Sequence, residues 1–309
     1  MYYITENRDC QDVFHFFYKK ERLFLKLTDL NTLKTVFNES GAAPDKKFGQ
    51  NFLISERVVA NIAENCGAAP EDGILEIGPG AGTLSQELCK RYAKVVAVEI
   101  DKKMIDVLSV TMNGVDNFTV INKDVMKTDI NALISEYFPG MRVSVCANLP
   151  YYITSPVVMS LLESGACFDY VTVMIQKEVA ARLAAKPGSA DYGAITPAVG
   201  YHAEVERLFT VPAGCFYPAP KVDSAVIRMK IRKTPPVVPK DKDLMFVLIK
   251  AAFNMRRKTL QNAVSSALNI DKQTVSDAIA SCGFDPSIRG EALSLYDFCR
   301  LSDALSGNI

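Results

Sequence analysis

The chain has 309 residues and a mass of 34.0 kDa, and at roughly 150 residues per domain this length predicts two domains. Its 49% hydrophobic and 23% charged residues are typical of a globular protein, which excludes disordered and collagen-like classes. Because 35 Lys and Arg balance 35 Asp and Glu, the net charge indicates no partner, and a nucleic-acid surface would have to come from local segregation of charge. No apolar run approaches the roughly 18 residues that span a membrane, so we expect a soluble protein with no membrane contact.

The first 26 residues form the least informative part of the sequence. They lack a basic segment followed by an apolar one, and Glu6, Asp9, Asp12 and Glu21 argue against an organellar transit peptide. We therefore expect a cytoplasmic protein in which residues 1–26 form a poorly ordered extension, which a misassigned translation start would explain. The alternative is an aromatic helix that binds a partner. The eight cysteines include no CxxC pair, so free thiols are expected and a bound metal is not.

The middle of the chain alternates between two kinds of pattern. Strand-like runs occupy 74–77, 95–100, 118–122, 143–147 and 170–176. Helical patterns alternate with them, at 55–66 before the first run and at 83–92, 102–112 and 155–163 between the others. This alternation is typical of βαβ units, and the Val- and Ile-rich strands predict a parallel sheet that is buried on both faces. We predict a doubly wound α/β fold.

The last third of the chain changes character. Two β-rich runs at 199–211 and 224–230 are followed by a proline-rich stretch at 234–239, which cannot continue a helix or a central strand. Only helical patterns follow, at 244–254, 256–268, 272–282 and 290–304. The domain division predicted from these patterns is a catalytic domain at 27–235 and a small all-helical domain at 240–309.

A glycine-rich turn follows the first predicted strand of the sheet. Gly78, Gly80 and Gly82 precede a helix, where missing side chains let the backbone approach a ligand at the carboxyl edge of the sheet. The spacing differs from the G-x-G-x-x-G of dinucleotide-binding loops, which disfavours a pyrophosphate. The alternative is a purely structural turn.

Two carboxylates follow the next two strands. Glu99 ends the second strand, where it can accept hydrogen bonds from both hydroxyls of a ribose. Asp124 follows the third strand and can accept a hydrogen bond from an adenine amino group. Together with Gly78 and Gly80, these residues predict a site for S-adenosyl-L-methionine in a Rossmann-like methyltransferase sheet.

Asn148-Leu149-Pro150-Tyr151 comes at the end of the fourth strand, where the proline makes the turn rigid. Methylating an exocyclic amine needs no strong base, but the nitrogen lone pair must be freed from the ring and aimed at the methyl group. The side-chain oxygen of Asn148 and a backbone carbonyl, assigned to Leu149, would accept hydrogen bonds from the amine. Tyr151 offers a face on which an extruded base can stack. The alternative is a turn with a packed tyrosine.

From about residue 27 to its end, the chain resembles the ribosomal small-subunit RNA adenine dimethyltransferases. The resemblance rests on five ordered motifs. These are the glycine loop at 76–83, Asn148-Leu149-Pro150-Tyr151, and the segments KFGQNFL at 47–53, FYPAPKVDS at 216–224 and FNMRRK at 253–258.

The resemblance implies further site residues. Asn51 and Leu53 would contact the cofactor beside Asn148, although the Gly49 turn and an amide could equally form an N-terminal helix cap. Phe216 would form the second aromatic wall of the target-base pocket, with packing in the core as the alternative.

Basic residues are concentrated between Lys221 and Lys258, where eleven of them face only three acidic residues. The resemblance places RNA at this segment. Arg256, Arg257 and Lys258, at the predicted start of a helix, would join Lys221 in contacting phosphates without reading sequence. Because such contacts do not read sequence, the choice of target would depend on the shape of an RNA hairpin. The alternative is that these residues form a solvated basic face.

The resemblance also implies the reaction. The expected activity is dimethylation of N6 of two adjacent adenosines in the 3′-terminal hairpin of 16S rRNA, within the small ribosomal subunit, by a monomer with a role in subunit biogenesis. One alternative is a 23S rRNA methylase of the macrolide-resistance type. Another is an assembly checkpoint factor whose binding matters more than its chemistry.

Overall fold

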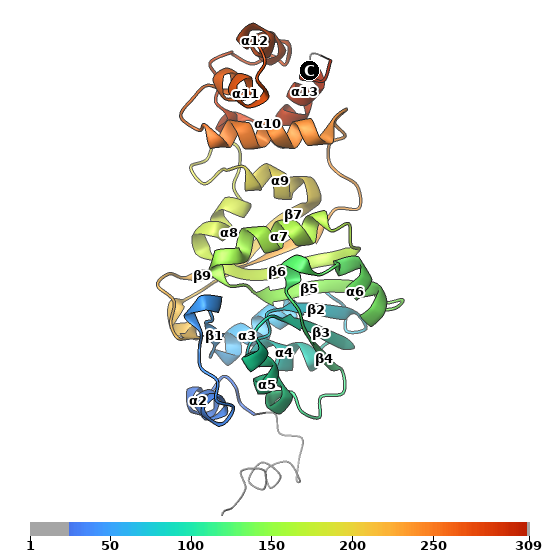
Figure 1. Cartoon of the computed structure of the whole chain (residues 1–309), viewed down its shortest axis with the longest axis vertical. Helices are drawn as coiled ribbons and strands as arrows, with labels where there is room; N and C mark the ends of the chain where they lie inside the picture. The colour runs from blue at the N-terminus through green and yellow to red at the C-terminus, as the bar shows by residue number, and fades with distance from the viewer. Residues whose placement is uncertain (1–24, 308–309) are drawn as a thin grey trace, which may run out of the picture.

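The computed structural model describes residues 25–307, apart from the side chain of Lys46. The predicted extension at 1–26 therefore lies almost entirely outside the described residues. Figure 1 shows an elongated molecule with a β-sheet in its lower and middle parts and a group of helices at the opposite end from α2 (Leu30–Glu39).

A seven-stranded sheet forms the centre of the described structure, in the order β4-β3-β2-β5-β6-β9-β7. Neighbouring strands from β4 to β6 are parallel, whereas β9 is antiparallel to both β6 and β7. The strands are β2 (Gly73–Ile77), β3 (Lys94–Glu99), β4 (Phe118–Asn122), β5 (Val143–Asn148), β6 (Phe168–Gln176), β7 (Ala203–Val211) and β9 (Ser224–Ile231). Because β2 lies between β3 and β5, the strand order reverses beside it, and open α/β sheets bind ligands at such a point.

Helices cover both faces of this sheet, as predicted for a doubly wound α/β fold. Successive strand residues point to opposite faces. Leu75 packs with α6 (Ile130–Tyr137) and α7 (Thr154–Glu163) in one buried cluster, whereas Ile74 packs with α3 (Glu56–Glu64) and α4 (Thr83–Cys89) in another. Both side chains are fully buried, so the prediction of a parallel sheet with two covered faces is confirmed.

The remaining elements complete the chain. The α-helices are α5 (Lys102–Thr111), α8 (Lys177–Leu183), α9 (Ile195–His202), α10 (Lys242–Asn254), α11 (Leu260–Leu268), α12 (Lys272–Ser281) and α13 (Leu295–Leu305). The short 3-10 helices are η1 (Lys46–Phe48), η2 (Val125–Lys127), η3 (Tyr151–Ile153), η4 (Ala213–Cys215) and η5 (Gly290–Ala292). Two short strands, β1 (Phe52–Leu53) and β8 (Phe216–Tyr217), pair with each other outside the main sheet.

Helices α10 to α13 share an apolar core, as expected for a helical C-terminal region. This core also includes Tyr201 on α9 and Val237 from the proline-rich stretch. The apolar contacts of the C-terminal helices therefore reach back to residues before position 235. The predicted domain boundary at 235–240 stays a prediction.

Three local predictions were wrong. The helix expected at 290–304 begins only at Leu295, because Ser294 caps α13, and the first residues of the run form η5. The run at 199–211 was expected to be β-structure, but its first residues lie on α9, where Pro197 is tolerated in the first turn and Val199 and Tyr201 are buried. The helix expected at 256–268 begins only at Leu260, after Thr259, whose hydroxyl caps the helix by accepting from the amide of Asn262.

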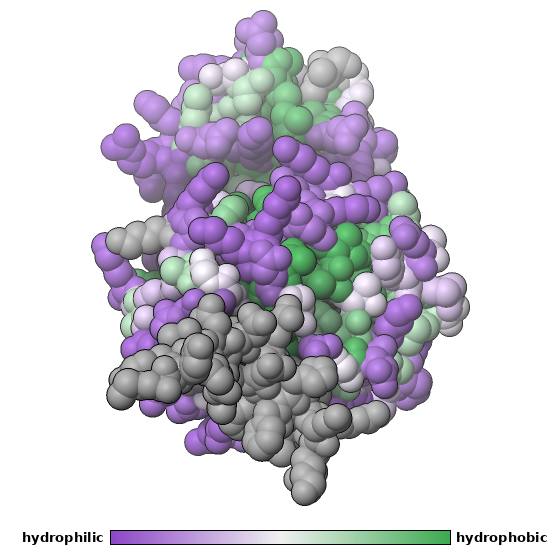
Figure 2. Space-filling view, turned by 60° about the horizontal axis from the view of Figure 1, so that its bottom comes forward, coloured by the Kyte–Doolittle hydropathy of each residue, from purple (hydrophilic) through white to green (hydrophobic). Residues whose placement is uncertain are grey.

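None of the helices that the structure describes is long and apolar enough to cross a bilayer. On the face shown in Figure 2, hydrophilic residues cover most of the described surface and surround apolar side chains near its middle.

Candidate functional site

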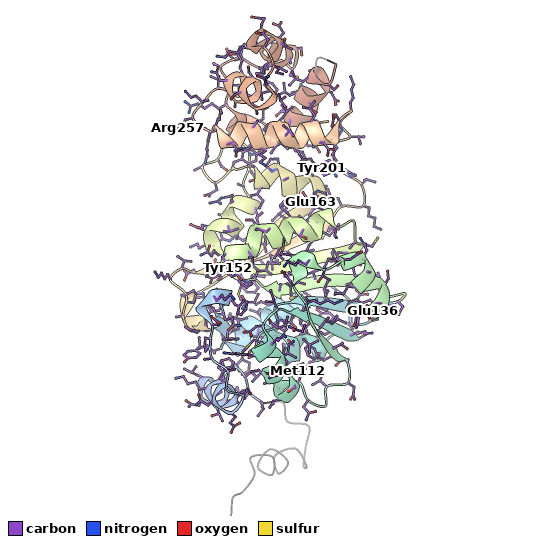
Figure 3. All side chains as sticks on the ribbon, in the orientation of Figure 1. Met112, Glu136, Tyr152, Glu163, Tyr201 and Arg257 are labelled. Atoms are coloured by element: carbon purple, nitrogen blue, oxygen red, sulfur yellow. The ribbon has the colours of Figure 1, made fainter. Side chains whose placement is uncertain are left out.

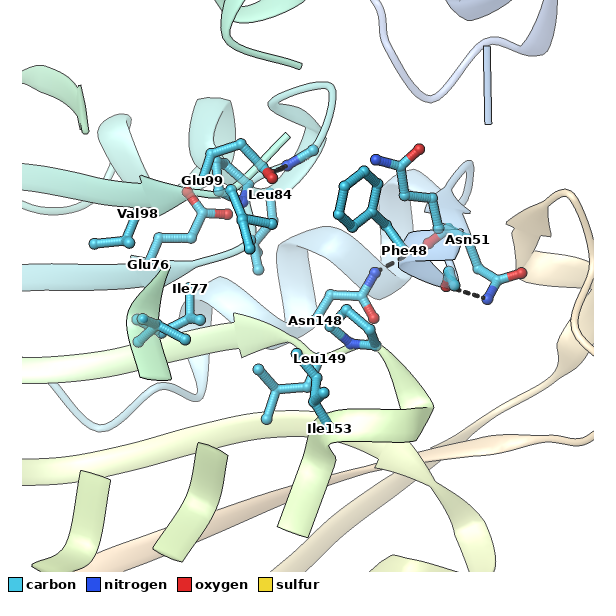
Figure 4. Close-up of a pocket in the computed structure, with 18 of the residues that line it drawn as sticks. Phe48, Asn51, Glu76, Ile77, Leu84, Val98, Glu99, Asn148, Leu149 and Ile153 are labelled. Atoms are coloured by element: carbon cyan, nitrogen blue, oxygen red, sulfur yellow. Dashed lines mark hydrogen bonds between the residues drawn. The ribbon is translucent and has the colours of Figure 1, made fainter. Parts of the chain in front are cut away.

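A cavity of about 320 Å³ opens at the carboxyl edge of strands β2 to β5 (Figure 4). It brings together most of the residues that the sequence singled out. These lining residues are Asn51, Leu53, Gly78, Gly80, Glu99, Asp124, Asn148, Leu149, Pro150 and Tyr151. Ten separately predicted positions thus share one site, although they come from four strand ends and from the segment around β1.

The glycine loop follows β2 directly and shapes one wall of the cavity. Gly78, Gly80 and Gly82 all have positive φ, at +69°, +57° and +91°, which L side chains rarely adopt. A Cβ on Gly80 would lie 3.0 Å from the ring of Phe52, whereas a Cβ on Gly78 would meet no atom within 4 Å. The turn therefore requires glycine at both positions, and it leaves open space for a ligand beside Gly78.

Glu99 is held by main-chain donors at the end of β3. Its Oε2 accepts from the amide of Gly80 at 3.1 Å, and its Oε1 accepts from the amide of Asp101 at 2.9 Å. Burial raises the pKa of Glu99, and these two hydrogen bonds oppose the rise because they stabilise the charged carboxylate. The carboxylate is thus fixed in place, with lone pairs that can accept from a ribose.

Asp124 caps the short helix η2. Its Oδ1 accepts from the amide of Met126 at 3.0 Å, and its Oδ2 lies 3.9 Å from Nζ of Lys127. The carboxylate is about one-third exposed and lines the cavity, so it can accept a hydrogen bond from a ligand there.

Two polar residues that the sequence analysis missed connect the segment around β1 to the loop after β3. Nε2 of Gln50 donates to Oδ2 of Asp101 at 2.8 Å, and Oε1 of Gln50 accepts from the amide of Asp45 at 2.9 Å. Asp101 also caps α5 through the amide of Lys103. An Asp immediately before a helical pattern is a recognisable cap signal, but its contact with Gln50 has no local signature.

The amide of Asn148 has a fixed orientation. Its Nδ2 donates to the main-chain carbonyl of Asn51 at 3.1 Å, and Nδ2 of Asn51 in turn donates to the carbonyl of Gly49 at 3.0 Å (Figure 4). Because the nitrogen of Asn148 is engaged, its Oδ1 is left as an acceptor. Within the described residues, neither this oxygen nor the carbonyl of Leu149 accepts a hydrogen bond. The site can therefore present two acceptors to an amine.

Two successive tyrosines follow this amide. The hydroxyl of Tyr151 shares a 2.8 Å hydrogen bond with that of Ser224 on β9, and burial raises the pKa of Tyr151. Tyr152 also lines the cavity but is 60% exposed. Tyr151 was predicted as a site residue, whereas no role was predicted for Tyr152 or for Phe48, another aromatic residue of the lining.

Phe216 lies outside the cavity lining. It is 3% exposed, and β8 pairs its backbone with that of Leu53 in β1. Both side chains belong to one buried apolar cluster, which is the core packing given as the alternative role. The role of Phe216 as a wall for the target base stays a prediction.

Glu76 is a second functional candidate that the sequence analysis missed. It lines the cavity from β2, is 1% exposed, and accepts a hydrogen bond from the hydroxyl of Ser85 at 2.6 Å. Burial raises the pKa of Glu76 to about 8, so the carboxyl is largely protonated at neutral pH. A glutamate inside a buried strand just before a glycine loop was a usable signal.

The four residues predicted to contact RNA differ in the interactions that they form within the protein. Nε of Arg256 donates to Glu291 at 2.7 Å, and its Nη2 donates to the carbonyl of Ala190 at 2.9 Å. Arg256 therefore connects the α10–α11 turn to the segments around 190 and 291.

The other three predicted contacts, Lys221, Arg257 and Lys258, are exposed and form no ion pair within residues 25–307. Figure 3 shows Arg257 on the same side of the molecule as Tyr152.

The basic segment is also partly neutralised on the sheet. Arg228 on β9 pairs with Glu206 on β7 at 2.7 Å, and Arg232, just after β9, pairs with Glu204 on β7 at 2.9 Å. Opposite charges on neighbouring strands stabilise their pairing. The number of basic residues at 221–258 is thus larger than the number whose positive charge is unpaired in the described structure.

Comparison with known proteins agrees with this geometry. The family model described as "Ribosomal RNA adenine dimethylase" matches residues 43–301. The chain is 47% identical over 263 residues to "Ribosomal RNA small subunit methyltransferase A" of Lachnoclostridium phytofermentans, covering 84% of this chain and 91% of that protein. It is 44% identical over 279 residues to the protein of that name from Bacillus mycoides, covering 89% and 96%.

Solved structures give the same result. The chain is similar to a dimethyladenosine transferase from Plasmodium falciparum, with a TM-score of 0.70, 25% identity and coverage of 83% of this chain and 98% of that one. It is also similar to the 23S rRNA methyltransferase ErmE, with a TM-score of 0.62, 26% identity and coverage of 83% and 100%. Since the family model spans most of the chain and curated relatives exceed 40% identity over more than four-fifths of it, the chain belongs to the ribosomal RNA adenine dimethylase family.

Proposed function

We propose that this protein transfers methyl groups from S-adenosyl-L-methionine to N6 of two adjacent adenosines in the 3′-terminal hairpin of 16S rRNA, within the small ribosomal subunit. The proposed enzyme acts in the cytoplasm as a monomer. The observation that carries the proposal is the hydrogen bond from Nδ2 of Asn148 to the carbonyl of Asn51, which leaves Oδ1 of Asn148 as an acceptor in the cavity.

The residues present fit the proposed cofactor. Glu99 offers a fixed carboxylate to the ribose hydroxyls, and Asp124 offers one to the adenine amino group. Gly78 leaves open space where a side chain would otherwise stand. When bound, S-adenosyl-L-methionine supplies an electrophilic methyl group on its sulfonium sulfur.

The chain's own residues would prepare the adenine amine. Two acceptors, Oδ1 of Asn148 and the carbonyl of Leu149, would hold the two amine hydrogens. This contact draws the nitrogen lone pair out of conjugation with the ring and aims it at the methyl group. Tyr151, oriented by Ser224, would stack against the extruded base. The amine proton becomes acidic only after transfer, so the site needs no strong base.

The small subunit is favoured over the large one as substrate. The relatives with 44–47% identity are named small-subunit methyltransferases, whereas the similarity to a 23S rRNA methyltransferase is at 26% identity. Exposed Arg257 and Lys258 would contact phosphates of the RNA, and Lys221 would do so from the loop before β9.

The direct test is transfer of labelled methyl groups to small subunits that lack the modification, followed by nucleoside analysis, with large subunits as the control. We expect dimethyladenosine on small subunits alone. Label on large subunits would instead assign the protein to the 23S enzymes.

A role in subunit assembly is compatible with this activity. An Asn148→Ala protein that makes no dimethyladenosine but still binds small subunits and restores growth of a deletion strain would show that binding matters apart from the chemistry. Loss of growth rescue with binding intact would tie the biological role to methylation.

A further inference from the structure

We propose that Tyr152 is an RNA-binding residue, whose exposed ring stacks on the base next to the adenosine held in the cavity. This inference rests on the proposed function, because it requires an RNA whose target base is extruded.

The exposure of Tyr152 distinguishes it from its neighbour. Tyr151 is partly buried and its hydroxyl is bound to Ser224, whereas Tyr152 is 60% exposed and its hydroxyl forms no hydrogen bond within the described residues. Both rings line the same cavity. One tyrosine is therefore fixed inside the site, and the next presents an unpaired aromatic ring to solvent at its opening.

The ring of Tyr152 lies close to the backbone at Gly49. A Cβ added to Gly49 would lie 3.3 Å from Cδ1 of Tyr152, so the absence of a side chain at Gly49 makes room for the ring. The carbonyl of Gly49 accepts from Asn51, whose own carbonyl accepts from Asn148. The same short segment thus positions both the exposed ring and the amide that would hold the reacting amine.

The position of Tyr152 in the cavity indicates RNA as its partner. The other strongly exposed apolar residues of the lining, Ile100 and Met126, lie beside Glu99 and Asp124, at the end proposed for the adenosyl group. Tyr152 instead follows β5, which is separated from β3 and β4 by β2 in the sheet, and it lies near Pro150 beside Gly49. A bound cofactor would therefore cover the first two side chains and leave Tyr152 for the RNA.

Extrusion of a base supplies a ligand for this ring. When one adenosine leaves its stack, its neighbour loses a stacking partner, and an aromatic ring at the opening of the pocket can replace it. Such stacking tolerates any base. Because the two proposed targets are adjacent, one adenosine would stack on Tyr152 while the other is methylated.

The test compares Tyr152→Ala with Tyr152→Phe, which keeps the ring. The matched control is Tyr296→Ala, which removes an equally exposed tyrosine (59%) from α13. With unmodified small subunits, Tyr152→Ala should raise KM roughly tenfold, or about 1.4 kcal/mol, and leave kcat and the Kd for S-adenosyl-L-methionine unchanged. Tyr152→Phe and Tyr296→Ala should behave as the unmutated protein.

A second measurement identifies the base. In subunits in which one of the two adenosines is replaced by an abasic nucleotide, the unmutated protein should show the raised KM, and Tyr152→Ala should raise it no further. Additive effects, an unchanged KM for Tyr152→Ala, or a weakened Kd for the cofactor would each overturn the inference. If the unmutated protein methylates no small subunits, the proposed function fails together with this inference. If it does methylate them and Tyr152→Ala is silent, the inference alone fails.

Discussion

The side-chain amide of Asn148 donates to the main-chain carbonyl of Asn51 across 3.1 Å, joining the end of β5 to a segment nearly a hundred residues earlier in the chain. The bond engages one of the two N–H groups of the amide, and it fixes the orientation in which Oδ1 of Asn148 can act on a substrate. It also makes the reacting group depend on the backbone around β1, because the acceptor is a carbonyl.

Asn148→Asp is expected to abolish most of the methylation. The carboxylate cannot donate to Asn51 and would instead face that carbonyl with like polarity. We expect kcat to fall by about a hundredfold or more, as for other displaced reacting groups. Binding of S-adenosyl-L-methionine, measured by calorimetry, provides the comparison. Asn131→Ala is the matched control, since Asn131 also donates to a carbonyl, that of Ser164, but lies outside the cavity. A fully active Asn148→Asp protein would contradict the assigned role of the amide.

The hydrogen bond between Tyr151 and Ser224 should orient the stacking ring. Ser224→Ala leaves the partly buried hydroxyl of Tyr151 without its partner, at about 1 kcal/mol of stability, and should lower kcat by about threefold to tenfold. Tyr151→Phe should have a similar effect. Because both changes remove the same bond, the double variant should be little worse than either single one in a double-mutant cycle. Additive losses would show that the two hydroxyls act independently.

The cavity was largely predictable because its parts lie in short contiguous motifs. The glycine loop and Asp124 follow strands of the parallel sheet, and Glu99 and Asn148 are the last residues of two others. Parallel strands bring their carboxyl ends to one edge. Alternation of strand and helix patterns was enough to place these motifs side by side.

Features that depend on distant contacts were not predictable in this way. The pairing of β1 with β8, which buries Phe216, joins two-residue strands whose partners lie far apart in sequence. α9 was mistaken for β-structure because its apolar residues acquire a helical role only through packing on the C-terminal helices, as Tyr201 does. The hydrophobic periodicity of a segment does not indicate which distant residues it will pack against.

Substitutions at Arg256 and at its two basic neighbours should have different effects, one on fold stability and the others on RNA binding. Arg257→Ala and Lys258→Ala should each weaken binding to small subunits and reduce the dependence of log K on log salt concentration by roughly 1, because each removes one phosphate contact. Their melting temperatures should not change.

Arg256→Ala should instead destabilise the fold. Its ion pair with Glu291 is solvent-screened and contributes below about 1 kcal/mol, to which the hydrogen bond to Ala190 adds a similar amount. We expect the melting temperature to fall by a few degrees. Glu291→Ala should reproduce the part of this fall in melting temperature that is due to the ion pair. A variant of Arg256 with normal stability and a reduced salt dependence would return this residue to the RNA-binding group.

The buried carboxyl of Glu76 should make stability depend on pH. Burial raises its pKa in the folded protein to about 8, against an ordinary value of 4.5, so the folded state retains a proton that the unfolded state releases. The stabilisation is fully present below pH 4.5 and is lost as the pH rises to about 8, an effect on the order of a few kcal/mol. Glu76→Gln should flatten this slope in denaturant unfolding without added cofactor, and it should be more stable than the unmutated protein at pH 8. Ser85→Ala should extend the window upward, because the Ser85 hydroxyl stabilises the charged carboxylate. Equal pH slopes for all three proteins would show that Glu76 keeps its ordinary pKa.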